Sequence, residues 1–282
     1  MIRLSGMQRR FTQLDVFTDR PYFGNPLAVV IDSEGLDTPE MQRFANWTNL
    51  SETTFLLPPT DPAADYRVRI FTPVAELPFA GHPTLGSAHA WLAHGGVPRR
   101  AGEVVQECGV GLVSIRVDGD ALAFAAPPLL RGGPVDEATL QQAVDELGID
   151  RNDVVDATWA DNGPGWLGLL LRSADEVLAI RPNAMQLTIG VAGPYPAGSP
   201  YAYEVRALYS DSGLTLEDPV TGSLNASLAQ WLIGTGRFTA PYVASQGTAL
   251  GRAGKVRITT DGAGAVWVGG DVVACISGTV EL

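Results

Sequence analysis

The sequence predicts an α+β fold of two pseudo-symmetric domains, each a mostly antiparallel β-barrel wrapped round one central helix. Short apolar runs alternate with turn residues throughout, since the 282 residues include 32 Gly and 20 Pro. One strand-and-helix pattern occurs twice, half a chain length apart. Both repeated helices are apolar around most of their circumference, so each must be buried on nearly all sides.

The repeat is clearest where a strand leads through an acidic residue and a glycine into an apolar helix. In the first half, Tyr66–Phe71 leads to a helix expected over Pro83–His94. In the second half, Tyr203–Leu208 leads to a helix expected over Gly222–Ile233, and both helices contain a Trp-Leu pair near their ends. Two amphipathic helices can resemble each other by chance, but the matched strands favour two similar domains.

We expect the first domain over residues 1–126, completed by the last strand at 273–282, and the second over residues 127–272. Two more helices are expected, over Thr38–Asn46 after a Thr-Pro start and over Asp136–Leu147 between an Asp cap and a glycine. Apolar runs rich in Val, Ile and Phe predict the remaining strands: Phe11–Phe17, Leu27–Ile31, Thr53–Leu57, Val104–Cys108, Leu112–Val117, Leu122–Ala125, Trp166–Leu171, Lys255–Thr259, Ala265–Val268 and Val272–Cys275.

Charge and composition exclude several classes of function. With 19 basic and 31 acidic residues, the net charge of −12 argues against nucleic-acid partners and against a polybasic membrane surface. No stretch approaches the roughly 18 apolar residues of a membrane span, and no signal peptide is recognisable, so a cytoplasmic protein is expected. Two cysteines exclude a disulfide-dense scaffold. The only lysine, Lys255, lies in a Gly-rich turn, which argues against a pyridoxal Schiff base.

The candidate site residues lie where the two repeated helices begin. The turns there read Ala80-Gly81-His82-Pro83-Thr84 and Asp218-Pro219-Val220-Thr221-Gly222-Ser223. A helix start has unpaired N–H groups and a partial positive charge, so two such starts facing one another could hold a small acidic substrate. Thr, Ser and Pro also favour helix starts for capping alone, so the turns fit either interpretation.

These turns belong to a wider resemblance. The chain resembles the PhzF-like family of phenazine biosynthesis, most densely in its first 95 residues and weakly over residues 127–200. The resemblance implies the diaminopimelate-epimerase-like fold, in agreement with the repeat. The motifs that carry it are Asp15-Val16-Phe17-Thr18, Gly24-Asn25-Pro26-Leu27-Ala28-Val29-Val30, Ser51-Glu52-Thr53-Thr54-Phe55, Arg69-Ile70-Phe71-Thr72-Pro73, Glu76-Leu77-Pro78-Phe79-Ala80-Gly81-His82-Pro83-Thr84 and Glu217-Asp218-Pro219-Val220-Thr221-Gly222-Ser223.

The resemblance implies a cofactor-independent isomerase, a homodimer as relatives often are, that moves a proton between carbons of a small carboxylic acid. The family's best-known substrate is a cyclic, amino-substituted acid. The residue matching Glu52 is the proton-transferring acid/base in a cleft between the domains, where a carboxylate can move a proton if water is excluded. The implied catalytic residues are Glu52, His82 and Asp218, and the implied substrate-binding residues are Gly81, Pro83, Thr84, Gly222 and Ser223.

Other interpretations stay open at this stage. Taken singly, Glu52 fits a solvated loop residue, and His82 fits a capping or packed histidine. An amino-acid racemase or epimerase on the same scaffold is an alternative, as is a small-molecule-binding relative without turnover. Related racemases use one thiol at each helix start, but Ala80 and Asp218 occupy those places here, while Cys108 and Cys275 fall in predicted strands.

Two further motifs are rejected as sites. His89 follows His82 by seven residues, whereas helical metal-binding pairs usually lie three or four apart, so no metal site is expected. The stretch Gly163-Pro164-Gly165-Trp166-Leu167-Gly168 fits the dinucleotide fingerprint by letter. That fingerprint must follow a strand and open a helix, whereas this stretch precedes a predicted strand, so we interpret it as a turn.

Overall fold

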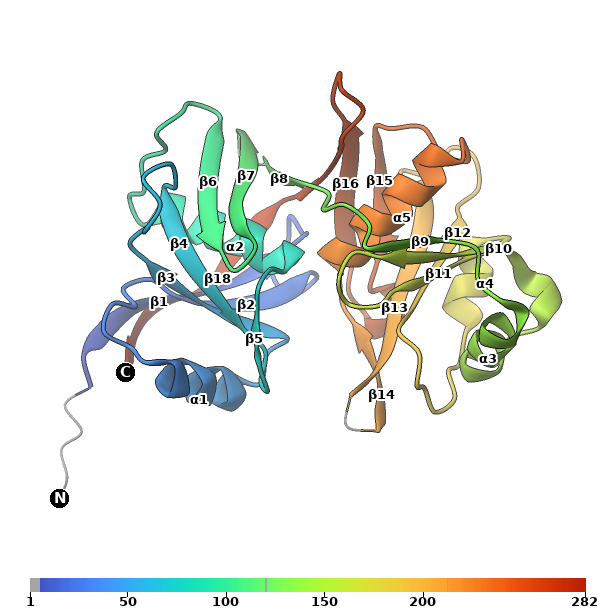
Figure 1. The fold of residues 1–282 in the computed structure, drawn as a ribbon, viewed down its shortest axis with the longest axis horizontal. Coiled ribbons are helices and arrows are strands. Elements are labelled where there is room, and N and C mark those ends of the chain that lie inside the picture. Colours follow the sequence, from blue (N-terminus) through green and yellow to red (C-terminus); the bar gives the residue numbers. More distant parts are fainter. Residues whose placement is uncertain (1–5, 120, 212) are drawn as a thin grey trace. The chain divides into compact units, whose positions relative to one another are not determined.

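The structure, a computed structural model, describes residues 6–119, 121–211 and 213–282, and its chain forms two compact units (Figure 1). Unit 1 contains Met1–Phe124 and Gly269–Leu282, and unit 2 contains Ala125–Val268. The sequence placed these divisions at 126 and 272. The second division falls inside a single strand, β17 (Val266–Gly270), and only Asp271 separates that strand from the last one.

Unit 1 is a curved sheet around one helix, α2 (Gly81–Ala93). The helix packs against β1, β2, β3, β4, β6 and β18, so it is enclosed on most sides. A second helix, α1 (Thr38–Thr48), connects β2 with β3. The strands are β1 (Gln8–Val16), β2 (Asn25–Val30), β3 (Glu52–Leu57), β4 (Tyr66–Phe71), β5 (Glu76–Leu77), β6 (Glu103–Cys108), β7 (Gly111–Asp118), β8 (Ala121–Ala125) and β18 (Val272–Glu281).

Unit 2 repeats this arrangement around α5 (Gly222–Gly234). Here the short helix α4 (Ala174–Ala179) connects β11 with β12, as α1 does for β2 and β3, and α3 (Glu137–Leu147) precedes the repeated part. The strands are β9 (Arg131–Gly133), β10 (Val154–Asp161), β11 (Leu167–Leu171), β12 (Ile189–Pro194), β13 (Tyr203–Asp211), β14 (Leu214–Asp218), β15 (Tyr242–Gln246), β16 (Gly254–Thr260) and most of β17.

The strand pairings are the same in both units. In unit 1, β1 pairs antiparallel with β2, β2 runs parallel to β3, β3 pairs antiparallel with β4, and β4 runs parallel to β6. In unit 2, the series β10, β11, β12, β13 and β15 has the same sequence of orientations. The outer neighbour of β1 is β18, the last strand of the chain, whereas that of β10 is β9. The predicted α+β fold with two repeated, mostly antiparallel halves is thus confirmed.

The two central helices differ from the others in how they begin. Asp37, Asp136 and Ser173 cap the N-termini of α1, α3 and α4 with their side chains. Neither Ala80, before α2, nor Thr221, before α5, makes such a side-chain capping bond. The helix-start motifs therefore do not act as ordinary side-chain caps, although both helices are buried along most of their length.

Close packing explains why two strands of unit 2 carry glycine. A Cβ added to Gly190 in β12 would lie 2.1 Å from Leu224 Cδ1, so the glycine makes room for α5. A Cβ on Gly193 would lie 2.2 Å from the Ser173 carbonyl oxygen at the start of α4. Burying one leucine such as Leu224 contributes about 1.5–3 kcal/mol, which outweighs the roughly 1 kcal/mol cost of a strand glycine.

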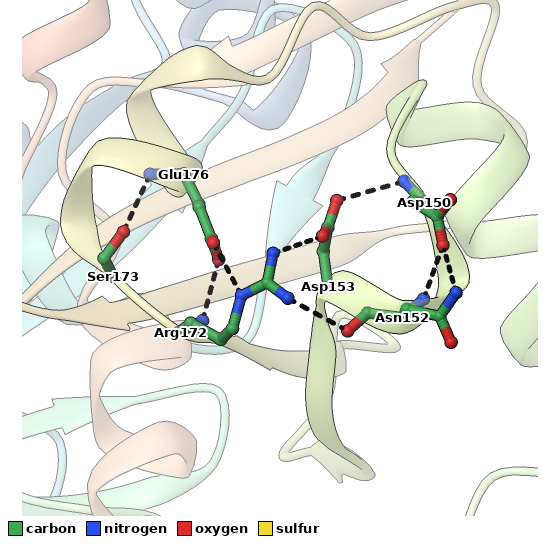
Figure 2. A network of polar contacts seen from close by, with 6 residues as sticks. All are labelled: Asp150, Asn152, Asp153, Arg172, Ser173 and Glu176. Carbon is green, nitrogen blue, oxygen red and sulfur yellow. Dashed lines mark hydrogen bonds and ion pairs between the residues drawn. The ribbon is translucent and has the colours of Figure 1, made fainter.

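A network of hydrogen bonds and ion pairs surrounds the start of α4 (Figure 2). Arg172 donates to Glu176 at 2.7 Å and to Asp153 at 2.5 Å, and Ser173 accepts from the Glu176 N–H. Asp150 in turn caps the short 3₁₀ turn Arg151–Asp153. Because the Arg172 side chain is 55% exposed, each ion pair contributes at most about 1 kcal/mol, and the network mainly fixes local geometry.

Several elements of unit 2 were missed by the sequence patterns. They are the strands β9, β10, β12, β14 and β15 and the helix α4, together with the short β5 of unit 1. Strand β12 shows the cause, because it contains Gly190, Gly193 and Pro194, which lower its β-propensity, yet five of its six residues are buried. The expected strand and helix ranges elsewhere coincide with elements of the structure, with ends that shift by a few residues.

Candidate active site

Glu52 and His82 lie side by side in unit 1. Glu52 is the first residue of β3, and His82 is the second residue of α2. His82 Nε2 lies 3.4 Å from Glu52 Oε2, and their side chains are 5% and 15% exposed. Glu52 is therefore not a solvated loop residue, and His82 is more than a packed one, because it faces a carboxyl group.

Strand pairing brings a third segment to this pair. Because β2 runs parallel to β3, Leu27 lies opposite Glu52, and Pro26 immediately precedes it. The His82 ring forms a hydrogen bond with the backbone of Pro26. Since the Pro26 nitrogen has no hydrogen and Nε2 faces Glu52, the donor is Nδ1–H and the acceptor is the Pro26 carbonyl.

The charge state of His82 follows from its surroundings. Burial lowers the pKa of His82 to about 3, and the hydrogen bond with Pro26 only partly opposes that shift. The imidazole is therefore neutral near pH 7. With the hydrogen on Nδ1, its Nε2 offers a lone pair to Glu52, so this nitrogen can accept a hydrogen bond from the carboxyl group whenever Glu52 carries a proton.

The other predicted residues of the α2 turn are buried beside this pair. Gly81 and Pro83 flank His82 at the helix start, and Thr84 is fully buried. The Thr84 hydroxyl donates to the Ala80 carbonyl at 2.8 Å and accepts from Gln106 Nε2 at 3.1 Å. The Thr84 hydroxyl therefore supports the helix start through these two hydrogen bonds, and its substrate contact stays a prediction.

In unit 2, Asp218 is oriented by a buried network. Gln246 accepts from the Thr221 N–H and from Asn225 Nδ2, which fixes the orientation of its amide group. Gln246 Nε2 then donates to the Thr221 hydroxyl oxygen at 2.9 Å, and this hydroxyl donates its own hydrogen to Asp218 Oδ2 at 2.5 Å. Asp218 Oδ2 therefore accepts from a hydroxyl that Gln246 holds in place.

Ser223, the second residue of α5, is half-buried and held by the loop before β11. Trp166 Nε1 donates to its hydroxyl oxygen at 3.1 Å, and Asn162 Nδ2 donates to its carbonyl at 2.9 Å. Asp218, Gly222 and Ser223 thus form one group at the β14–α5 turn of unit 2, while Glu52 and His82 form another in unit 1.

Sequence reasoning missed four residues that support these groups: Gln106, Gln246, Asn162 and Trp166. A signal existed for the glutamines, because Gln246 follows Gln106 by 140 positions, the separation between Trp91 and Trp231 in the repeated helices. Asn162 and Trp166 lie in and beside the stretch that imitates the dinucleotide fingerprint. That stretch is a loop before β11, as expected, and it contacts the start of α5.

The two thiols occupy other positions. Cys108 ends β6 and Cys275 lies in β18, and both are free and half-buried. Burial raises the pKa of both thiols, so they are protonated near neutral pH. Among the described residues, no group of three His, Cys, Asp or Glu side chains has the arrangement of a metal site. In the same part of the chain, no helix is long and apolar enough to cross a membrane.

The structure is thus a twice-repeated α+β unit in which a buried carboxyl group of unit 1 lies beside a neutral imidazole. The sequence matches the family described as phenazine biosynthesis-like protein over residues 14–278. The chain belongs to this PhzF family, and it is an enzyme of the isomerase type.

Similar proteins span nearly the whole chain. Antisense-enhancing sequence 1 of Schizosaccharomyces pombe is 36% identical, over 96% of this chain and 98% of that protein. A trans-2,3-dihydro-3-hydroxyanthranilate isomerase of Pseudomonas fluorescens is 34% identical, over 85% of this chain and 86% of that protein. The crystal structure of a PhzF-family protein from Bacillus anthracis has a TM-score of 0.82 at 22% identity and covers 98% of this chain and 100% of that one, which confirms the predicted fold.

Proposed function

We propose that this protein moves a proton between two carbons of a small cyclic carboxylic acid, with Glu52 as the acid/base. The observation that carries the proposal is the Glu52–His82 pair, a carboxyl group 15% exposed with a neutral imidazole 3.4 Å away. Because the isomerase of Pseudomonas fluorescens is 34% identical, trans-2,3-dihydro-3-hydroxyanthranilate is the first substrate to test.

In the proposed reaction Glu52 both removes and returns the proton. The ionised carboxylate takes a proton from a ring carbon, and the electron pair of the broken C–H bond spreads into the adjoining conjugated system. The protonated carboxyl group then returns this proton to another carbon of that system, which restores the carboxylate, so neither oxidant nor reductant is consumed. Shielding from water favours this return over loss of the proton to solvent.

His82 suits the task of holding Glu52 between the two steps. A cationic histidine would stabilise the carboxylate and weaken it as a base, whereas a neutral one leaves its basicity intact. Once Glu52 is protonated, Nε2 can accept a hydrogen bond from it and fix the carboxyl group. The distance of 3.4 Å is longer than a strong hydrogen bond, and such contacts often shorten when substrate binds.

The candidate residues of unit 2 are proposed to polarise and bind the substrate. We assign Asp218, with Thr221 donating to it, to polarise the substrate, and Gly222 and Ser223 to bind it through the start of α5. Gly81, Pro83 and Thr84 keep their proposed substrate-binding role at the start of α2. The uncapped starts of both helices support this assignment, because unpaired N–H groups favour carboxylates.

The test is the variant Glu52→Gln, which keeps size but cannot accept a proton from carbon. Turnover of trans-2,3-dihydro-3-hydroxyanthranilate should fall by about 10²–10⁴-fold, while a product-like acid binds with similar affinity. The exposed Glu34 offers a matched control, and Glu34→Gln should keep wild-type turnover. In deuterated solvent, deuterium should enter the wild-type product at no carbon other than the newly protonated one, and only to the extent that Glu52 exchanges its proton with water before returning it.

Two outcomes would separate the alternatives. If Glu52→Gln retained near-normal turnover, the mechanism would be wrong even though the family assignment stands. If the wild type bound the acids of a substrate panel without converting any of them, the protein would be a binding relative and the proposed activity would be wrong.

A further inference from the structure

The loop over residues 161–166 of unit 2 reaches the start of α5 through two side chains. Trp166 donates from Nε1 to Ser223 Oγ at 3.1 Å, and Asn162 donates from Nδ2 to the Ser223 carbonyl at 2.9 Å. One contact fixes the side chain of Ser223 and the other fixes its backbone. All three residues belong to unit 2.

The loop itself is built to hold this position. Asp161 Oδ1 accepts from the N–H groups of Gly163 and Gly165, each at 2.7 Å. Both glycines have positive φ, 142° and 89°, which other residues rarely adopt. Trp166 is only 4% exposed and leads directly into β11, so its ring is fixed by packing.

The chemistry of the indole decides what the serine can do. An indole N–H only donates, so the Ser223 oxygen must accept in this contact. The hydroxyl hydrogen then points elsewhere, and among residues 6–119, 121–211 and 213–282 none accepts it in a hydrogen bond. The half-buried Ser223 hydroxyl therefore accepts through its oxygen and has a hydrogen that is available to donate to a ligand.

We propose that Trp166 is a positioning residue that makes the Ser223 hydroxyl a hydrogen-bond donor to a carboxylate oxygen of the substrate. A carboxylate is the acceptor that fits, because the neighbouring N–H groups at the start of α5 favour negative charge. This inference rests on the proposed function, since it uses Ser223 as a substrate-binding residue. In this proposal the stretch over residues 163–168, which fits the dinucleotide fingerprint by letter, contributes through Trp166 to the recognition of a carboxylate.

A double-mutant cycle with 3-hydroxyanthranilate as the probe tests this coupling. Trp166→Phe keeps an aromatic ring but loses the donor, and it should weaken binding about 3–10-fold, as expected for one hydrogen bond. In a Ser223→Ala background the same change should alter Kd less than about twofold, because no hydroxyl remains to be oriented. Trp159→Phe, a matched change in β10, should leave Kd unchanged in both backgrounds.

Two further readouts separate positioning from packing. In the isomerase assay, Trp166→Phe should raise KM and leave kcat within about twofold, because the lost contact serves the ground state and transition state alike. The indole N–H signal of Trp166 in wild-type protein should shift in Ser223→Ala, a measurement that requires no change at Trp166. Replacing the carboxylate of the probe with a carboxamide should reduce the effect of Trp166→Phe.

The outcomes are distinct from those that test Glu52. If Trp166→Phe cost the same factor with and without the Ser223 hydroxyl, Trp166 would act by packing alone and the inference would be wrong. If the wild type did not bind the carboxylate probe, the inference would also be overturned. If the cycle showed coupling while Glu52→Gln kept its turnover, only the proposed function would fail.

Discussion

His82 combines two features that only burial can produce together. It is neutral near pH 7 because burial lowers its pKa to about 3, and its tautomer is fixed by the hydrogen bond with Pro26. A histidine in water would be partly charged below pH 7 and would exchange tautomers freely. The buried ring therefore presents an unprotonated Nε2 to Glu52 at 3.4 Å.

The buried imidazole predicts a loss of stability in acid. Between about pH 6.5 and pH 3 the unfolded chain binds a proton at His82 that the folded protein does not, so stability falls as the pH falls through this window. The loss should reach about 3 kcal/mol by pH 4.5, at up to ~1.4 kcal/mol per pH unit. Urea unfolding of wild type and His82→Gln at several pH values measures it.

The matched control is the half-buried His94, whose pKa is lowered by burial and by the nearby Arg10. His94→Gln should keep most of the acid sensitivity, whereas His82→Gln should lose this contribution. Equal slopes for wild type and His82→Gln between pH 6.5 and pH 4.5 would contradict a neutral His82.

At the scale of elements, a buried glutamine from a later strand forms hydrogen bonds with residues at the start of each central helix. Gln106 in β6 donates to Thr84 in α2 and accepts from the Tyr66 hydroxyl. Gln246 in β15 makes four hydrogen bonds to residues at the start of α5. Both glutamines lie on a strand that runs parallel to the strand before the helix, Gln106 opposite Tyr66 of β4 and Gln246 opposite Val205 of β13, so the repeat extends to the polar support of both helices.

This arrangement predicts graded costs for removing the two glutamines. Gln246→Met fills a similar volume but leaves the Thr221 N–H and the amide of Asn225 without their acceptor. We expect a loss of about 3–5 kcal/mol, and about 2 kcal/mol for Gln106→Met, since each orphaned buried group costs about 1–3 kcal/mol. Thermal and urea unfolding would measure both.

Catalytic activity is the second measurement for the variants Gln246→Met and Gln106→Met. With Gln246 gone, the Thr221 hydroxyl is free to rotate away from Asp218, so kcat/KM should fall in Gln246→Met even where the protein is fully folded. Equal destabilisation of both variants, with unchanged activity in Gln246→Met, would refute the ordering role of this network.

At the scale of the whole molecule, unit 1 is closed by the two ends of the chain. Strand β18 pairs with β1 along its whole length, from Gln8 opposite Glu281 to Val16 opposite Val272. Met7 and Leu282 then exchange backbone hydrogen bonds of 2.8 and 3.2 Å. In unit 2 the short β9 takes the corresponding place beside β10, so only unit 1 depends on the end of the chain.

This closure predicts opposite outcomes for two rearrangements of the chain. Deleting residues 272–282 removes the partner of β1 and one wall around α2, so unit 1 should lose cooperative unfolding and the protein its activity. Moving residues 271–282 in front of Met7 through an Asn-Gly turn keeps the pairing, because the two ends are already neighbours. Circular dichroism melts and turnover compare them.

The truncated and the rearranged chains together test whether unit 1 needs β18 beside β1. The rearranged chain should fold and keep its activity, since it changes connectivity and no contact. A truncated protein that melted like the wild type would show that β18 is dispensable, and an unfolded rearranged chain would show that its covalent order matters.

The sequence alone determined the repeat, the central helices α2 and α5, and the segments that contain Glu52, His82, Asp218 and Ser223. These follow from signals local in the chain, namely apolar periodicity, turn residues and contiguous motifs. Where local signals are weak, the prediction failed, as for β12, whose glycines are explained only by α5 packing against them.

Tertiary structure alone decided which candidate site residues lie together and which charge state His82 has. Pairing of β2 with β3, and the packing of α2 against both strands, bring Pro26, Glu52 and His82 together, and burial then makes the imidazole neutral. The contact between Trp166 and Ser223 joins residues 57 positions apart. Protonation and hydrogen-bond direction depend on the solvent and neighbours that surround a group, and strand pairing between distant segments sets both, so no local pattern of residues encodes them.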